Sequence, residues 1–241
     1  MILTAHQPAY LPWLGYFHKV ALADVFVILD SVQYEKNSFI NRNRIKTSNG
    51  EAWLTIPVEM KGHLDRTIRD VRIDSRSNWR KKHWNSLLLN YRKAAFFDRY
   101  ADFFEHYYRM ETCSLSEFIE VSRVFFLKEL NIAPRILKLS EMAIASKKQE
   151  LIIDLCKATH SKAFVFGALG RNYATAELFE KNGINTYFQE FSHLGYTQLW
   201  GQFAQYMSII DPLFNLGAER TRELIFDGNI SKKELESFFG R

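Results

Sequence analysis

The polar residues that could do chemistry gather at the start of the chain, where short apolar segments end. His6 follows the apolar run 2–5, and Asp30 follows a second apolar run at 25–29. A histidine can bind an anion or act as a general base near neutral pH, and an aspartate can bind a hydroxyl, an amine or a metal ion. We therefore predict that His6 and Asp30 are catalytic. The alternatives are a histidine that fixes a turn and an aspartate that caps a loop.

The residues after His6 predict an anion-binding site at the beginning of a helix. A helix over 12–23 would start at Pro12 and present free backbone N–H groups, which favour a phosphate or a carboxylate. Side chains on either side of this turn and just after Asp30 would then contact the substrate. These predicted contacts are Gln7, Tyr10, Trp13, Tyr16, Gln33 and Tyr34.

A basic segment follows and forms the densest polar cluster of the chain. It consists of Asn41, Arg42, Asn43, Arg44 and Lys46. Strand alternation would place Arg42, Arg44 and Lys46 on one face, where their charges suit a diphosphate or a carboxylate. A solvated edge strand protected by its charges is the alternative. We expect this segment to share one cleft with His6 and Asp30.

Further substrate contacts are predicted later in the chain. Gly167 begins a strand-to-helix turn that can approach a phosphate closely, and His83 lies on a helix, where a packed structural histidine is the alternative. His193, Tyr196 and Gln198 share a loop and suit a ligand rich in hydroxyl groups. Because none of the spacings matches a metal cage or a P-loop, we predict no metal site and assign no cofactor.

The composition limits the class of partner. The 241 residues are 24% charged and 47% hydrophobic, with a net charge of +5, which suits an anionic small molecule. No long Lys/Arg run supports nucleic acid as the partner. No apolar run approaches the roughly 20 residues that span a bilayer, and a strand begins at residue 2. We therefore expect no membrane insertion, no signal peptide and a cytoplasmic location.

The elements that must position these residues alternate between strands and helices. Apolar strands are predicted at 2–5, 25–29, 135–139, 163–166 and 185–189, and helices at 12–23, 149–159 and 174–182. Asn49-Gly50 between two extended runs predicts a hairpin over 41–58, and 67–73 alternates like a further strand. Helices over 78–93, 97–110 and 114–130 interrupt the pattern.

This order predicts an α/β fold. It is Rossmann-like, with a mostly parallel sheet flanked by helices, a β-hairpin and a helical insertion at about 75–130. We expect residues 1–241 to form a single domain.

Several motifs resemble the WbqC-like protein family. They are His-Gln-Pro-x-Tyr-x-Pro-Trp-x-Gly-Tyr at 6–16, Leu-Asp-x-Val-Gln-Tyr at 29–34 and Asn-Arg-Asn-x-Ile-Lys at 41–46. Tyr-Thr-Gln at 196–198 and Ser-Ile-Ile-Asp-Pro-Leu-Phe-Asn-Leu-Gly at 208–217 extend the resemblance over nearly the whole chain. Members are associated with bacterial O-antigen and other surface-polysaccharide genes, so the resemblance implies a role in that pathway, lipopolysaccharide biosynthesis included.

The N-terminal part also resembles, more distantly, nucleotidylyltransferases and pantothenate synthetases. Their His-x-Gly-His signature grips nucleotide phosphates, but the matching positions here are Trp13-Leu14-Gly15-Tyr16. Both imidazoles are absent, so the resemblance implies a shared fold and does not support direct nucleotidyl transfer.

Residues and resemblance together lead to one main hypothesis, a transferase that adds an acyl or aminoacyl group to an amino group of a nucleotide-linked sugar. The basic segment would hold phosphate, and His6 or Asp30 would remove a proton from the attacking amine. One alternative is a non-catalytic protein that binds or assembles glycan intermediates, in association with other polysaccharide-biosynthesis enzymes. The other is an RNA-binding protein that uses the basic segment and Lys81-Lys82.

Overall fold

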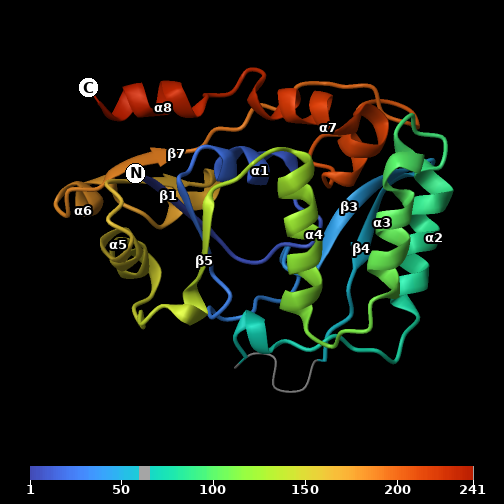
Figure 1. Cartoon of the computed structure of the whole chain (residues 1–241), viewed down its shortest axis with the longest axis horizontal. Coiled ribbons are helices and arrows are strands. Elements are labelled where there is room, and N and C mark those ends of the chain that lie inside the picture. Colours follow the sequence, from blue (N-terminus) through green and yellow to red (C-terminus); the bar gives the residue numbers. More distant parts are fainter. Residues whose placement is uncertain (60–65, 241) are drawn as a thin grey trace.

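A five-stranded parallel sheet forms one side of the computed structural model, which describes residues 1–59 and 66–240; it lies in the left half of Figure 1. Its strands are β1 (Ile2–His6), β2 (Val25–Ile28), β5 (Arg135–Lys138), β6 (Ala163–Phe166) and β7 (Asn185–Phe188). They lie side by side in the order β5-β2-β1-β6-β7, and every neighbouring pair is parallel. The predicted α/β fold with a parallel sheet is confirmed.

Helices cover both faces of this sheet, because alternate side chains of each strand point to opposite faces. Val25 and Val27 belong to the core that includes Leu155 of α5, whereas Phe26 belongs to the core that includes Phe17 of α1. The helices around the sheet are α1 (Leu14–Ala21), α5 (Lys148–Ala158), α6 (Ala176–Glu180), α7 (Ile210–Phe226) and α8 (Lys232–Phe239). The last two were not predicted from the sequence.

A hairpin and three helices separate β2 from β5 along the chain. The hairpin pairs β3 (Arg42–Thr47) with β4 (Gly50–Thr55) in antiparallel register, as predicted. The helices are α2 (Trp79–Tyr91), α3 (Phe97–Arg109) and α4 (Leu115–Glu129), within the predicted helical insertion. Their buried aromatic side chains belong to the same core as α1 and one face of the sheet.

The prediction of a strand over 67–73 is wrong. Residues Ile68–Asp70 form a short 3-10 helix, and strand-like contacts are limited to single bridges from Thr67 to Gln33, from Arg72 to Ser114 and from Ile73 to Val58. Backbone N–H groups of this segment bond to loop carbonyls instead of to a neighbouring strand. The apolar alternation reflects burial of its side chains in a loop that packs on the core.

The buried carboxylate of Asp211 links the hairpin, α2 and the C-terminal part of the chain through hydrogen bonds. Tyr91 of α2 donates a hydrogen bond to Oδ2 of Asp211, and Tyr196 donates to Oδ1, both at 2.7 Å. The backbone N–H of Lys46 in β3 donates to the Tyr91 hydroxyl at 2.9 Å. Burial raises the pKa of Asp211, and the two tyrosine hydrogen bonds oppose that shift.

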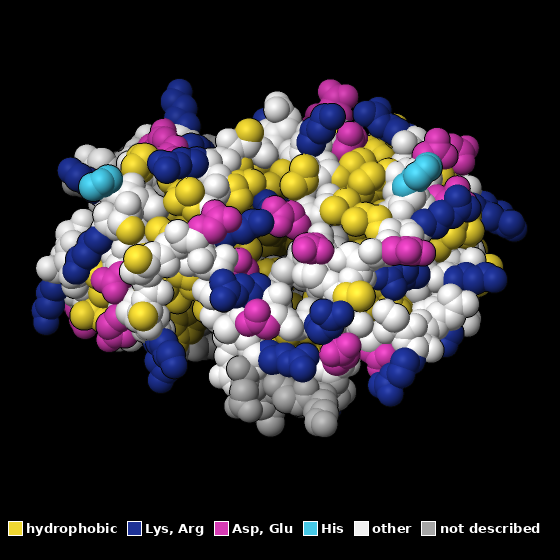
Figure 2. Space-filling model, turned by 60° about the horizontal axis from the view of Figure 1, so that its bottom comes forward, with side chains coloured by type: hydrophobic (Ala, Val, Ile, Leu, Met, Phe, Trp, Pro, Cys, Tyr) yellow, Lys and Arg dark blue, Asp and Glu magenta, His cyan; other side chains and the backbone are white. Residues whose placement is uncertain are grey.

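Charged side chains of both signs are interspersed on the face shown in Figure 2, which has no continuous basic surface among its coloured residues. None of the helices described for this chain has the length and apolar character that a membrane span requires.

We predict that Asp211→Ala lowers the free energy of unfolding by about 2–4 kcal/mol, because it leaves two buried tyrosine hydroxyls without their acceptor. Urea unfolding measures this change. Asp102→Ala, at an exposed position of α3, is the matched control and should change stability by less than about 0.5 kcal/mol. Equal effects of the two substitutions would contradict the structural role of the Asp211 network.

Candidate functional site

A cavity of about 580 Å³ lies at the carboxyl ends of β1 and β6. These strands are neighbours, but the chain leaves β1 toward β2 on one side and leaves β6 toward β7 on the other. Such a reversal of strand order leaves a crevice in which ligands of α/β proteins bind. The volume is within the range of small-molecule sites, roughly 300–1,000 Å³.

Polar groups from the sheet edge meet an aromatic wall in this cavity, which we call the switch-point cavity. His6 and Gln7 come from the end of β1, Gly167 follows β6, and Gln189 follows β7. The ring-bearing residues that line it are Trp13, Tyr16, Phe39, Tyr173, Phe191, His193 and Tyr206. Thus the structure brings together His6, which was predicted to be catalytic, and five predicted contacts, namely Gln7, Trp13, Tyr16, Gly167 and His193.

His6 is held as a neutral imidazole. Its Nδ1 lies 2.7 Å from the backbone carbonyl of Gln7, which can only accept, so Nδ1 carries the hydrogen and Nε2 keeps a lone pair. The rings of Trp13 and Tyr16 pack edge-on against it, with centroids at 5.8 and 5.0 Å. Burial, and next the charge of Lys19, lower the pKa of His6 to about 3. His6 therefore offers a hydrogen-bond acceptor and is a weak base at neutral pH.

Lys19 is the functional candidate that the sequence interpretation missed. Its side chain is buried, and Nζ donates to the carbonyl of Ala5 in β1 at 3.0 Å. A Cβ placed on Gly167 would lie 3.9 Å from Nζ, so the amine lies between the ends of β1 and β6. Burial lowers the pKa of Lys19 to about 7. One feature of the sequence could have identified it: Lys19 lies one helical turn after Tyr16, so the two side chains share a face of the helix.

The opposite wall is fixed by hydrogen bonds between α1 and the end of β7. Nε2 of Gln189 donates to the carbonyl of Gly15 at 2.8 Å and to Nδ1 of His18 at 2.7 Å. His18 in turn donates from Nε2 to the carbonyl of Ile230 at 2.8 Å. These bonds hold the helix that carries Tyr16 and Lys19 at a fixed distance from the sheet edge.

A larger cavity of about 1220 Å³ adjoins the switch-point cavity along the ends of β1 and β2. Both cavities are lined by Gln7, Leu29, Glu35 and Tyr173. The cationic side chains at the larger cavity are Arg66, Lys147 and Lys148. Gln33, another predicted contact, also lines it.

Asp30 does not line either of these cavities. Its two carboxylate oxygens accept hydrogen bonds from the backbone N–H and the hydroxyl of Ser140, at 2.9 and 2.6 Å. It faces a separate cavity of about 250 Å³, which Arg69 and Arg123 also line. This geometry is that of an aspartate that caps a loop, the alternative considered above.

The basic hairpin is also separate from His6. Arg42 stacks on Trp53, with its guanidinium 4.4 Å from the ring centroid, and Arg44 forms an ion pair with Glu51. Among the described residues that line the two adjoining cavities, none comes from β3 or β4. His6, Asp30 and the hairpin therefore do not meet in one cleft.

Three further predicted contacts, Tyr10, Asn43 and His83, form hydrogen bonds within the core. The Tyr10 hydroxyl lies 2.9 Å from Nδ1 of His83, and Asn43 donates from Nδ2 to the carbonyl of Leu11 at 2.6 Å. That bond holds a turn in which Leu11 has a φ of 45°, a strained value for a leucine. Burial lowers the pKa of His83 to about 4, so this histidine is neutral as well.

Five other predicted residues are likewise engaged inside the protein. Lys46 donates from Nζ to Oε1 of Gln198 at 2.9 Å, and Gln198 donates to the Tyr196 hydroxyl at 3.1 Å. Asn41 donates from Nδ2 to the carbonyl of Ile56, just after β4, at 2.7 Å. Tyr34 is buried, with its backbone bonded to the carbonyl of Arg66.

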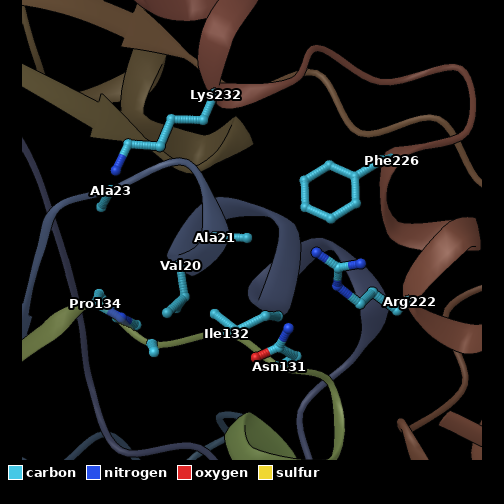
Figure 3. Close-up of a pocket in the computed structure, with 10 residues that line it drawn as sticks. Val20, Ala21, Ala23, Asn131, Ile132, Pro134, Arg222, Phe226 and Lys232 are labelled. Atoms are coloured by element: carbon cyan, nitrogen blue, oxygen red, sulfur yellow. The ribbon is translucent and has the colours of Figure 1, made fainter. Parts of the chain in front are cut away.

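A small cavity of about 180 Å³ lies at the opposite, amino ends of β2 and β5. Figure 3 shows Arg222 and Phe226 of α7 facing Ala21 and Ile132 across it. None of the predicted site residues lines this cavity. Within the described part of the chain, no three His, Cys, Asp or Glu side chains come together to hold a metal ion.

We predict that Lys19→Met raises the free energy of unfolding at pH 7 by about 1–3 kcal/mol. The pKa of Lys19 falls from its ordinary 10.5 to about 7 on folding, so between these pH values the unfolded chain binds more protons. Burial of the amine therefore destabilises the fold at pH 7, and this destabilisation fades as the pH rises to 10.5.

Urea unfolding at pH 7 and pH 10 measures the effect, with Lys157→Met at an exposed position of α5 as the control. A gain that is equal at both pH values, or a loss at pH 7, would contradict the lowered pKa.

Comparisons with known proteins place this geometry in a family. The model of the WbqC-like protein family matches residues 7–223. An uncharacterized protein of Mycobacterium tuberculosis, Rv1507c, is 38% identical over 215 residues, which cover 88% of this chain and 93% of the relative. No solved structure matches the chain significantly. The resemblance that the motifs indicated is confirmed, and the chain belongs to the WbqC-like protein family.

Proposed function

We propose that the protein is a transferase of bacterial surface-polysaccharide (O-antigen) biosynthesis, which moves an acyl or aminoacyl group to an amino group of a nucleotide-linked sugar. The observation that carries this proposal is the pair of adjoining cavities at the carboxyl edge of the sheet. A transfer reaction needs two substrates with their reacting groups in contact, and binding both in a fixed orientation supplies much of the rate. Two compartments that share a wall meet this need.

The larger cavity suits the nucleotide part of the substrate. Arg66, Lys147 and Lys148 give it three cationic side chains, against one carboxylate among its described lining residues, Glu35. Guanidinium and ammonium groups are the usual protein ligands of phosphate oxygens. We assign the diphosphate to this cavity and not to the β3–β4 hairpin, because Arg42 stacks on Trp53 and Arg44 pairs closely with Glu51. Arg66 has a looser ion pair, with Glu59 at 3.6 Å.

The switch-point cavity suits the amino sugar and the acyl donor. Its aromatic wall, which includes Trp13 and Tyr16, can stack on a sugar ring, and Gln7 lies in the wall between the two compartments. The lone pair of His6 Nε2 would accept a hydrogen bond from the attacking amine and orient it toward the acyl carbon. With a pKa of about 3, His6 orients the amine and leaves proton removal to a stronger base.

Family membership supports the pathway in this proposal, since WbqC-like proteins are associated with surface-polysaccharide genes. The chemistry rests on the cavities alone.

We predict that the protein binds a nucleoside-diphosphate amino sugar and that Arg66→Gln weakens this binding about tenfold, because it removes a phosphate ligand. Isothermal titration calorimetry measures the dissociation constants. Arg44→Gln is the matched control, because it removes the same charge from the hairpin and should leave binding unchanged within twofold.

The opposite pattern, with Arg44→Gln weakening binding and Arg66→Gln having no effect, would place the phosphate on the hairpin. Failure of the wild-type protein to bind any nucleotide-linked sugar or acyl donor would overturn the proposed function. Binding of both substrates without product by mass spectrometry would favour the non-catalytic alternative.

A further inference from the structure

We propose that Lys19 is a catalytic residue, the group that takes the proton from the attacking amine in the switch-point cavity. This inference rests on the proposed function and adds the proton acceptor that His6 and Asp30 do not supply.

The position of the amine is the first argument. Lys19 is 5% exposed and lines the cavity, and its Nζ lies between the ends of the two strands that form the switch point. An ammonium group has three N–H donors, and the carbonyl of Ala5 accepts one of them. Among the described residues, no carboxylate forms an ion pair with Lys19, and burial is what shifts its pKa. A buried lysine so placed has an amine directed at whatever occupies the cavity.

The surrounding charges are the second argument. The titratable groups that line the cavity are His6 from β1, Tyr16 from α1, Glu35 from the segment after β2, Tyr173, and His193 and Tyr206 from the 189–209 segment. Burial keeps both histidines neutral, with pKa values of about 3 and 4, and raises the pKa of Tyr16 well above its ordinary value, so Tyr16 stays protonated. Lys19 lines the same cavity, and its pKa of about 7 suits it to exchange a proton near neutral pH.

The proton balance of the transfer follows from this placement. The amino nitrogen of the sugar attacks the carbonyl carbon of an activated acyl donor, such as a thioester, and a C–N bond forms. The bond from that carbon to the leaving group breaks, and the leaving group keeps the electron pair. The proton lost by the attacking nitrogen passes to the free amine of Lys19. Lys19 becomes an ammonium that donates to the Ala5 carbonyl, and then returns the proton to the leaving group or to water.

A purely anchoring role for Lys19 makes different predictions. A lysine that held a phosphate or a carboxylate as a permanent cation could be replaced by arginine, which also carries a positive charge. A proton acceptor could not, because arginine does not release its proton in the working pH range.

The direct test is a pH titration of Lys19 in the intact protein, by NMR of ¹³Cε-labelled lysine, with the resonance assigned by its loss in Lys19→Met. We expect a midpoint near pH 7, and the same chain unfolded in urea provides the reference. A midpoint above pH 9 would overturn the proposal, because the amine would then be a permanent cation.

The second test separates this inference from the proposed function. With the wild-type protein active, we expect Lys19→Arg to lower kcat at least 100-fold with KM changed less than threefold, and to abolish the rise of kcat through pH 7. Lys19→Ala should regain activity with added methylamine. Full activity of Lys19→Arg would overturn the role of Lys19 and leave the transferase intact. A wild-type protein that transfers no acyl group would overturn the transferase itself.

Discussion

The reversal of strand order beside β1 is the constraint on which the rest of the structure depends. Because β2 and β5 lie on one side of β1 and β6 and β7 on the other, the crossover connections diverge and leave a hollow at the carboxyl edge. The first polar residue after the β1 core, His6, and the glycine after β6, Gly167, are thereby brought to one place although 160 residues separate them in the chain. Helix α1 then closes the hollow and inserts Lys19 from the side.

Burial of polar groups near this hollow lowers the stability of the fold, which makes them candidates for function. Burial favours the neutral forms of His6 and Lys19: it lowers the pKa of His6 to about 3 and that of Lys19 to about 7. The polar residues of the Asp211 network are buried as well, but they bond to one another, and they fasten the C-terminal segment to the hairpin. One set of buried groups is satisfied internally, and the other faces an open cavity. That difference distinguishes a structural cluster from a candidate site.

Much of the fold could be predicted because its signals are local. The apolar run Val25–Ile28 and the Asn49-Gly50 turn each determine their element within a few residues. The site was only partly predictable, because a side chain at a strand end can turn toward the cleft or toward the protein. His6 lines the cleft, whereas Asp30 accepts hydrogen bonds from Ser140, 110 positions away in the chain. Lys19 was missed because its neighbours in the fold, Ala5 and Gly167, lie on two strand ends that no sequence spacing relates to it.

The location of the substrate cleft is the central claim, and a crystal structure of the protein with a nucleoside-diphosphate amino sugar tests it most directly. The account predicts sugar density in the switch-point cavity beside His6 and Lys19, with the diphosphate continuing past Gln7 toward Arg66. Density against Arg42 and Trp53 on the hairpin, or in the small cavity beneath Arg222, would contradict it.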